Sequence, residues 1–294
     1  MKDDGKDKKM FENFPIKSSG EKEKIIGYSW PKKDPDYVIC IIHGIGEHAG
    51  RYDRMNRFLS EANMACLSMD LKGHGASSGK RGHCAPRKSV LEDIDALLEH
   101  AVKMYPGKPV ILYGHSLGGN IALDYRARGK SNDVPFAYMI SAPWIELVNK
   151  PAAPLFLFVR VMSGICPEMT IKSAVNEEDL GHPVSVKPYK TNPMVHDKIS
   201  MLCAFEAFET GEALAKNQNE DNGRSKGKPL LLMHGTEDRI CSIEGSRKFV
   251  SHEKEACTYI EWEGMFHEIH NGNRENDGTE VIMKMVEWIR ELKA

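Results

Sequence analysis

The sequence predicts an α/β fold in which helices cover both faces of a mostly parallel β-sheet, with a helical or irregular cap inserted into the chain. Three observations lead to this class. Short apolar runs rich in β-branched residues alternate with segments of helical spacing. The alternation stops over residues 144–215 and then resumes. A glycine-flanked serine stands where one predicted strand passes into a helix.

The composition excludes several functional classes. The 294 residues are 41% hydrophobic and 28% charged, with a formal net charge of −2 and no dense basic run, so nucleic acid is not an expected partner. Residues 1–9 are charged, and no apolar stretch reaches the about 18 residues that can span a bilayer. Seven cysteines, several inside apolar strands and none in a C-x-x-C pair, indicate buried reduced thiols. We therefore expect a cytoplasmic protein.

The strands and helices of the predicted core follow one another in order. Residues 1–24 are polar and charged, and they predict a mobile N-terminal tail. Strands are predicted at residues 25–30, 36–42, 64–69, 109–113, 136–140, 229–233 and 257–262. Helices are predicted at residues 53–62, 89–105, 120–128 and 242–252, with a last one from about residue 279. The core therefore comprises residues 25–143 and 229–294.

An insertion at residues 144–215 interrupts this order. It is rich in proline, shows no clean strand and contains an apolar block at residues 152–162. We expect it to form a cap over the edge where the parallel strands end. The polar segment 216–228 predicts a flexible link back to the core.

The apolar block of the cap has two compatible interpretations. It can pack the cap onto the core, or it can form the wall of an acyl-chain tunnel or a shallow face that docks on membranes. The candidate residues are Leu155, Phe156, Phe158 and Val159. A docking face would place the protein transiently at a membrane surface.

The serine lies in the run Gly114-His115-Ser116-Leu117-Gly118-Gly119. A predicted strand, 109–113, precedes it and a predicted helix, 120–128, follows, with Gly129 as a stop signal. A serine on such a sharp turn has a strained backbone, and its hydroxyl stands clear of the sheet edge. This context predicts a nucleophile; the alternative is a plain glycine-rich turn.

A serine hydroxyl needs a base within hydrogen-bond reach and an acid that orients the base. Functional groups of an open α/β sheet gather at the carboxyl ends of its strands, so both partners should follow late strands. Asp238 lies five residues after one such strand and His267 five residues after the next. Glu237 is a rival acid, and His270 and His252 are rival bases. Asp238 could also serve only to form an Asx turn.

Main-chain amides are expected to bind the oxyanion of the reaction intermediate. One donor is the N–H of Leu117, the residue after the nucleophile. The other is expected in the loop after an early strand, where the glycines around Ile45 allow its N–H to point inward. His43 and His48 are expected to brace this loop by hydrogen bonds.

Two other runs of residues resemble cofactor-binding or metal-binding motifs, but neither is expected to have that function. The run Gly44-Ile45-Gly46-Glu47-His48-Ala49 matches the dinucleotide pattern G-x-G-x-x-A, but Glu47 would repel a pyrophosphate. The run His267-Glu268-Ile269-His270 lacks the spacing of the zinc motif H-E-x-x-H. We expect neither an organic cofactor nor a metal.

The same residues resemble the α/β-hydrolases of the monoacylglycerol lipase and lysophospholipase group. The resemblance extends over residues 25–292 and rests on the motifs at 43–48, 51–52, 70–77, 114–119, 238–241 and 266–267. It implies a Ser–Asp–His triad and hydrolysis of a single-chain glycerol ester through an acyl-enzyme. It also implies a cysteine, here Cys241, near the glycerol end of the pocket. The candidate pocket residues outside the cap are Glu47, Arg51, His115 and Cys241.

Two departures from the family pattern affect specificity. Ile45 is bulky where the family often has a small residue, and the cap is the family's most variable part. Both leave the preferred chain length and head group open, although not the chemistry.

The hypothesis is a serine hydrolase that cleaves monoacylglycerols or related single-chain lipid esters into fatty acid and glycerol. A lysophospholipase or a broad carboxylesterase would use the same three side chains. A peptidase of this fold is less favoured, because no acidic cluster is evident that could bind an amino terminus. A non-catalytic ligand receptor on a hydrolase scaffold is the alternative from another class.

Overall fold

The computed structural model describes residues 11–17, 24–173, 175–184, 186, 191–253 and 257–292. Its centre is an eight-stranded sheet in the order β1-β2-β4-β3-β5-β6-β9-β10. The strands are β1 (Glu12–Lys17), β2 (Lys24–Trp30), β3 (Tyr37–Ile42), β4 (Met64–Met69), β5 (Val110–His115), β6 (Ala137–Ser141), β9 (Leu230–Gly235) and β10 (Cys257–Trp262). All neighbours from β4 to β10 are parallel, whereas β1 and β2 pair antiparallel. The predicted mostly parallel sheet is confirmed.

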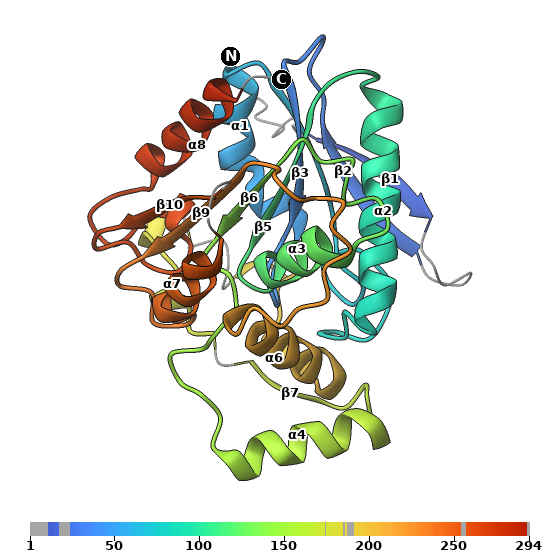
Figure 1. The fold of residues 1–294 in the computed structure, drawn as a ribbon, viewed down its shortest axis with the longest axis vertical. Coiled ribbons are helices and arrows are strands. Elements are labelled where there is room, and N and C mark those ends of the chain that lie inside the picture. Colours follow the sequence, from blue (N-terminus) through green and yellow to red (C-terminus); the bar gives the residue numbers. More distant parts are fainter. Residues whose placement is uncertain are drawn as a thin grey trace, which may run out of the picture.

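Helices cover both faces of the sheet (Figure 1). One face packs against α1 (Asp53–Glu61) and α8 (Thr279–Glu291), and the other against α2 (Arg87–Met104), α3 (Leu117–Arg128) and α7 (Ile243–His252). The alternation of side chains along β3 shows why both faces are apolar. Val38, Cys40 and Ile42 belong to the α2–α3 side, and Ile39 and Ile41 to the α1–α8 side.

The helix that follows Ser116 begins earlier than the sequence predicts. We expected it at residue 120, but α3 begins at Leu117, directly after the serine. Gly118 and Gly119 are poor helix formers and hid this first turn in the sequence pattern. The structure needs Gly118 here, because a Cβ on it would lie 2.1 Å from the carbonyl oxygen of Ile42 in β3.

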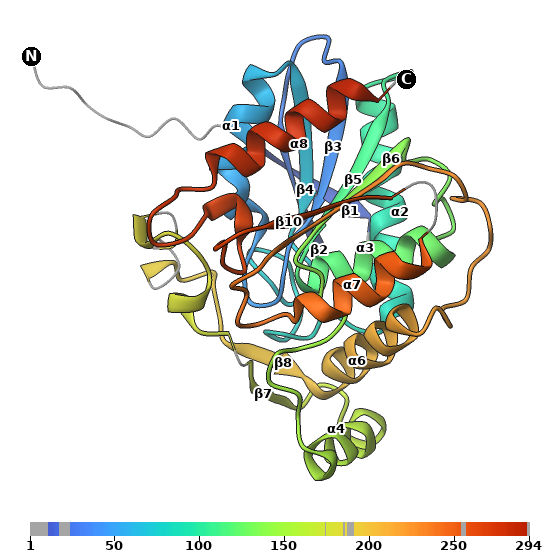
Figure 2. The same cartoon turned by 60° about the vertical axis from the view of Figure 1, so that its left-hand side comes forward.

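The elements of the cap are α4 (Ala153–Ile165), β7 (Thr170–Lys172), the 3₁₀ turn η2 (Glu177–Asp179), β8 (Lys198–Ser200) and α6 (Met201–Ala215). The helix α4 and strand β7 of the cap lie below the sheet in both views (Figures 1 and 2). The expectation of no strand in this segment is wrong, since β7 and β8 form a short antiparallel pair. Three residues each are too few to show a period of two in the sequence.

The expected mobile tail is wrong for residues 12–17. They form β1 at the edge of the sheet, and the Phe14 ring stacks on His100 with centroids 3.9 Å apart. Residues 1–10 and 18–23 of that prediction lie outside the described residues. Polar composition and Pro15 concealed the strand, although proline is tolerated at a sheet edge.

The predicted link, 216–228, contains no helix or strand in the structure. It is nevertheless tied to the core by several hydrogen bonds, two of which reach the end of α3. Asn222 Nδ2 donates to the Gly129 carbonyl over 3.1 Å, and Ser225 Oγ donates to the Arg126 carbonyl over 2.5 Å. These bonds attach the segment to the end of α3.

The cysteines are free thiols. Cys40, Cys66, Cys84, Cys203 and Cys241 are buried, Cys257 is half-buried and Cys166 is exposed. The predicted burial of the strand cysteines holds for Cys40 and Cys66, whereas Cys257 at the start of β10 is half-buried. Over the described ranges, no helix has both the length and the apolar character to cross a bilayer.

Candidate active site

Ser116 occupies a strained turn between β5 and α3. Its φ is 56° and its ψ is −119°, a conformation that non-glycine residues rarely adopt. Gly114 and Gly118 make the turn sterically feasible, since a Cβ on Gly114 would lie 2.4 Å from the Gly118 carbonyl oxygen. The turn is held by the Ser116 N–H, which donates to the Ser141 carbonyl in β6 over 3.1 Å. The predicted strand-to-helix context of the serine is confirmed.

The structure brings Ser116, His267 and Asp238 into one hydrogen-bonded chain. Ser116 Oγ lies 2.9 Å from His267 Nε2, and His267 Nδ1 lies 2.7 Å from Asp238 Oδ2. The three residues come from loops after β5, β9 and β10, which end at the same edge of the sheet. All three are buried. In this geometry the carboxylate accepts a hydrogen bond from the Nδ1–H group and leaves Nε2 free to accept the serine proton.

Asp238 both forms an Asx turn and orients the histidine, so the two interpretations of the sequence were not exclusive. Its Oδ1 accepts the N–H groups of Ile240 and Cys241 over 2.8 and 3.0 Å. Its Oδ2 faces His267 and also lies 3.1 Å from His234 Nε2. Burial alone would raise the pKa of Asp238, but the charges and hydrogen bonds of the two histidines outweigh it and hold the pKa well below its usual value.

The rival acid and the rival bases take no part in the Ser116–His267–Asp238 chain of hydrogen bonds. Glu237 is exposed, and so is His252 on α7. His270 is buried and stacks on Tyr52 with centroids 5.4 Å apart. His234 was not predicted as a site residue; it lies near the end of β9, four residues before Asp238, and the turn after the strand brings the two side chains together. Its signal was a polar residue at the carboxyl end of an apolar strand.

Several charges set the protonation of His267. Burial lowers its pKa, but the Asp238 carboxylate raises it by charge and by hydrogen bonding, and Glu268 and Glu47 raise it further. The net pKa is above the usual value of a histidine. The rings of His115 and His270 belong to the same cluster, with the His115 centroid 4.8 Å from that of His267. Burial, followed by the charges of neighbouring histidines, lowers the pKa of His115 well below its usual value.

The two candidate oxyanion donors lie on loops that adjoin Ser116. Leu117 is the first residue of α3, and the first N–H groups of a helix have no partner within the helix. The Ile45 N–H donates no hydrogen bond to any described residue. His43 Nε2 accepts the Leu71 N–H over 3.0 Å, and His48 Nδ1 accepts the Gly50 N–H over 3.1 Å. The two histidines thus brace the loop as predicted.

An apolar cavity of about 210 Å³ opens beside Ser116. Ile45 and Cys241 border it next to the serine, and the cap supplies its far wall with Leu155, Val159 and Phe208. Its other lining residues are Trp144, Leu147, Asn149, Pro151, Ile171, Lys172, Ser173, Val175, Ile199, Ala204 and Ile240. The cavity is therefore a narrow space of mostly hydrocarbon character that ends at a serine hydroxyl.

The structure divides the eight candidate pocket residues into three groups. Leu155, Val159 and Cys241 line the cavity as predicted. Glu47, Arg51 and His115 line a much smaller space of about 10 Å³ on the other side of Ser116. Phe156 and Phe158 do not line the cavity, which corrects the prediction. Phe156 faces a separate groove, and Phe158 is 46% exposed on the outer face of α4.

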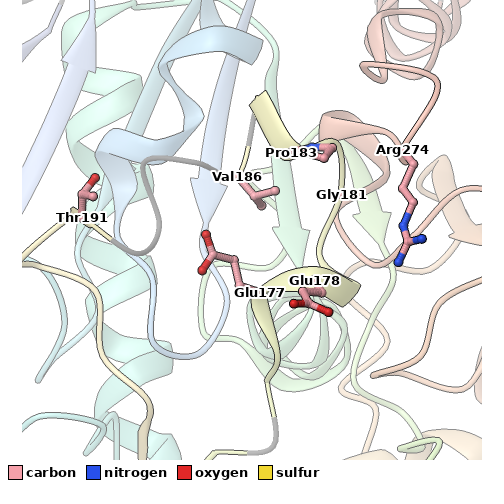
Figure 3. A pocket seen from close by; sticks show the side chains of 7 residues that line it. All are labelled: Glu177, Glu178, Gly181, Pro183, Val186, Thr191 and Arg274. Atoms are coloured by element: carbon pink, nitrogen blue, oxygen red, sulfur yellow. The ribbon is translucent and has the colours of Figure 1, made fainter.

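A larger pocket of about 580 Å³ lies at the rim of the cap (Figure 3). It is lined by Glu177, Glu178, Gly181, Pro183, Val186, Thr191 and Arg274. None of these residues is a nucleophile paired with a base, so this pocket offers no bond-breaking chemistry comparable to that at Ser116. The acidic turn η2 (Glu177–Asp179) lies at its edge, which corrects the expectation that the chain has no acidic cluster.

Comparison with known proteins agrees with this geometry. The profile of the family described as serine aminopeptidase, S33 matches residues 33–274. An uncharacterised abhydrolase domain-containing protein of Dictyostelium discoideum is 30% identical over 277 residues, which are 93% of this chain. The chain spans only 28% of the length of that relative.

Two further relatives match over most of both chains. A monoacylglycerol lipase of Mycolicibacterium smegmatis is 28% identical, with 88% of this chain and 90% of the relative covered. The crystal structure of Paleococcus ferrophilus monoacylglycerol lipase superposes with a TM-score of 0.78 at 30% identity, covering 90% of this chain and 98% of that one. The chain therefore belongs to the serine aminopeptidase S33 family and is an α/β-hydrolase of the monoacylglycerol lipase group.

Proposed function

We propose that this protein is a serine hydrolase that cleaves monoacylglycerols into fatty acid and glycerol. The observation that carries the proposal is the Ser116–His267–Asp238 chain of hydrogen bonds at the end of an apolar cavity. The cavity suits one hydrocarbon chain, and the similarity to monoacylglycerol lipases supports the choice of head group.

In the proposed reaction, Ser116 Oγ attacks the ester carbonyl while His267 Nε2 takes the hydroxyl proton. The resulting oxyanion accepts hydrogen bonds from the N–H groups of Ile45 and Leu117. Collapse of this intermediate releases glycerol, which receives the proton from His267, and leaves the acyl group on Ser116. His267 then takes a proton from a water molecule that attacks the acyl carbonyl; as the bond to Ser116 Oγ breaks, His267 returns this proton to Oγ and the fatty acid leaves. Asp238 stabilises the imidazolium ion in each half of the reaction.

Replacement of Ser116 tests this proposal directly. Ser116→Ala should lower turnover of monoacylglycerols by about 10⁴-fold or more while the unfolding midpoint stays near that of the parent. A fluorophosphonate probe should label the parent and leave the variant unlabelled. Substantial hydrolysis by the variant, or a parent that neither labels nor hydrolyses, would overturn the proposal and favour a non-catalytic receptor.

We also propose that the outer face of α4 touches membrane surfaces from which the substrate is taken. Leu157, Phe158, Val161 and Ile165 on this helix are 59%, 46%, 49% and 68% exposed. Exposed apolar area of this kind on one helix supports binding at a lipid interface. Free thiols are typical of a reducing compartment, so we place the enzyme in the cytoplasm.

Vesicle sedimentation tests the membrane contact. Leu157→Glu combined with Ile165→Glu should lower binding to neutral phosphatidylcholine vesicles, while hydrolysis of a water-soluble short-chain ester stays unchanged. Both side chains point away from the cavity lining, so the substitutions separate binding to lipid from chemistry. Equal sedimentation of the variant and the parent would contradict the proposal.

An aminopeptidase activity is the second candidate, favoured by the acidic turn η2. Glu177, Glu178 and Asp179 follow one another there and line two pockets near the cap. Carboxylates at this place are suited to bind an ammonium group. A panel of monoacylglycerols, lysophospholipids, short esters and aminoacyl p-nitroanilides separates the candidates by their kcat/KM values. Preference for the anilides would support the peptidase and reject the lipase.

A further inference from the structure

We propose that Arg51 and Glu268 are positioning residues that, together with Glu47, hold the oxyanion loop and the histidine loop at a fixed separation. The proposal rests on the hydrolytic function above and assigns a role to three charged residues that the reaction itself does not use. We call the three side chains the Glu47–Arg51–Glu268 bridge.

The bridge joins two distant parts of the chain. Arg51 Nη1 and Nη2 donate to Glu268 Oε1 and Oε2 over 2.7 and 3.0 Å, so the pair is bidentate. Arg51 Nη1 also donates to Glu47 Oε2 over 2.9 Å. The guanidinium group is planar and rigid, and a bidentate pair fixes orientation as well as distance. The carboxylates of Glu47 and Glu268 are therefore held on one cation.

At one end, the bridge holds the oxyanion loop. Glu47 Oε1 accepts hydrogen bonds from the Gly44 N–H over 2.6 Å and from the Tyr52 hydroxyl over 2.9 Å. Gly44 lies between this carboxylate and the nucleophile, since a Cβ on it would be 3.0 Å from Glu47 Oε1 and 3.2 Å from Ser116 Cβ. A shift of Glu47 would move the peptide that precedes the Ile45 N–H.

At the other end, the bridge holds the histidine. Glu268 is the residue next to His267, and its Oε2 accepts a hydrogen bond from Asn271 Nδ2 over 2.7 Å. The main chain here is bonded to the cap, because His267 N–H donates to Asp179 and Glu268 N–H to Leu180, over 3.3 and 2.7 Å. The cap thus supports one side of the loop, and Arg51 supports the side that faces the core.

The topology explains why such a contact is needed. The oxyanion loop follows β3 and the histidine loop follows β10, and β5, β6 and β9 lie between these strands in the sheet. The histidine loop must therefore return past two strands, β9 and β6, to reach Ser116, and past a third, β5, to reach the oxyanion loop. No strand pairing sets the distance between the two loops, whereas the bridge spans it directly.

The burial of the bridge favours a specific role over a general gain in stability. The side chains of Arg51, Glu47 and Glu268 are 8%, 5% and 3% exposed. Two carboxylates and one guanidinium group lose their hydration there, and a buried ion pair offsets that loss only with very good geometry. Because apolar residues could pack the same volume, a charged bridge is best explained by the geometry that it imposes on the two loops.

The test compares two matched variants of the full-length chain. Glu268→Gln removes one charge of the bridge and keeps the shape of the side chain. Glu253→Gln is its control, because Arg126 binds Glu253 in the same bidentate manner over 2.9 and 3.0 Å, between α3 and the end of α7. Both variants are followed by their unfolding midpoint and by kcat and KM for a short-chain ester.

Glu268→Gln should lower kcat by about 10- to 100-fold, because a misplacement of about 1 Å at the reacting groups can cost about 100-fold. KM should stay within about threefold, since the cavity is not touched. The control should keep the parental kcat even if its unfolding midpoint falls as far. Arg51→Lys, which keeps the charge but not the bidentate geometry, should show the same fall in kcat at unchanged KM.

A parental kcat in Glu268→Gln, or an equal fall in the Glu253→Gln control, would overturn the proposal. Failure of the proposed function looks different. In that case Ser116→Ala would keep its activity, or no ester would be hydrolysed by the parent. If the parent hydrolyses esters, Ser116→Ala is inactive and Glu268→Gln is unimpaired, only the bridge is disproved.

Discussion

At the scale of single residues, His267 lies among groups with opposite effects on its charge. Asp238 bonds to its Nδ1, Glu268 is its neighbour in the chain, and Glu47 lies nearby in the Glu47–Arg51–Glu268 bridge. These carboxylates favour the imidazolium form. Burial of the ring favours the neutral form. The carboxylates outweigh this effect, so the pKa of His267 is raised.

This balance predicts the pH dependence of the reaction. His267 must be neutral to accept the Ser116 proton, so activity is lost as the pH falls through its raised pKa. The acid limb of the kcat/KM profile should therefore have its midpoint above the about 6.5 of an ordinary histidine. The measurement is kcat/KM for a short-chain ester, whose ionisation does not change between pH 5 and 9. A midpoint below 6 would show that burial outweighs the carboxylates.

The strain at Ser116 is also a property of single residues. Its positive φ costs energy that the surrounding turn must supply. Gly114 and Gly118 let β5, α3 and the end of β3 approach closely enough to hold it. The same close approach sets the Leu117 N–H beside the serine. The glycines of this motif are needed because they have no side chain and so allow this approach, whereas the serine is needed for its hydroxyl.

At the scale of elements, α6 forms the boundary of the cavity beside Ser116. Phe208 on this helix lines both the cavity and the groove behind it. Its ring packs edge-on against Trp144 on the cavity side and Phe156 on the groove side, with centroids 5.3 and 5.7 Å apart. Phe208 is therefore the aromatic part of the partition between cavity and groove, to which Leu147 and Pro151 also contribute.

Removal of this ring should change the preferred chain length. Phe208→Ala joins the cavity to the groove and makes room for longer acyl chains. Each added methylene that is buried contributes about 0.8 kcal/mol, so two more would raise kcat/KM for long chains by roughly tenfold. The measurement is kcat/KM over a series of monoacylglycerols of increasing chain length.

Phe156→Ala is the matched control, because Phe156 lines the groove but not the cavity. It should leave the chain-length profile unchanged, and butyrate esters should be hydrolysed equally by both variants. An unchanged profile in Phe208→Ala would show that the cavity ends elsewhere.

At the scale of the whole molecule, the sheet carries the site on its parallel part and is extended at one edge by β1 and β2. The reacting loops follow β3, β5, β9 and β10. Phe14 on β1 packs over Gly27 of β2 and stacks on His100 of α2. This edge lies away from the Ser116 cavity, to which none of the three residues contributes. A substitution at this edge is therefore expected to change the stability of the fold without changing catalysis.

Phe14→Ala should destabilise the fold without impairing the reaction. The ring is half-buried, so we expect a loss of roughly 1–3 kcal/mol in the free energy of unfolding, below the about 3–5 kcal/mol of a fully buried phenylalanine. Urea unfolding measures the loss, and kcat/KM for a short ester should remain within twofold of the parent. A large fall in kcat/KM for the folded variant would show that this edge is coupled to the site.

The sequence alone was sufficient to predict the alternating core and the three residues Ser116, Asp238 and His267. The reason is local: each of them follows a buried apolar strand, and the ends of parallel strands meet at one edge of the sheet. The apolar runs of the strands and the glycines around the serine can be recognised directly in the sequence. Because the strands are parallel, the loop after each strand lies at the same edge of the sheet, and this can be predicted without knowing any contact between distant segments.

Only the tertiary structure could decide how these loops meet one another. Glu268 pairs with Arg51, 217 positions away, because of the path that the histidine loop takes back across the sheet. Phe156 and Phe158 were predicted to face the cavity, but the docking of α4 on α6 turns one toward the groove and the other outward. Periodicity shows that a helix has an apolar face, whereas its neighbours determine what that face covers. The catalytic side chains therefore follow from the sequence, and the contacts that hold them follow from the packing of distant segments.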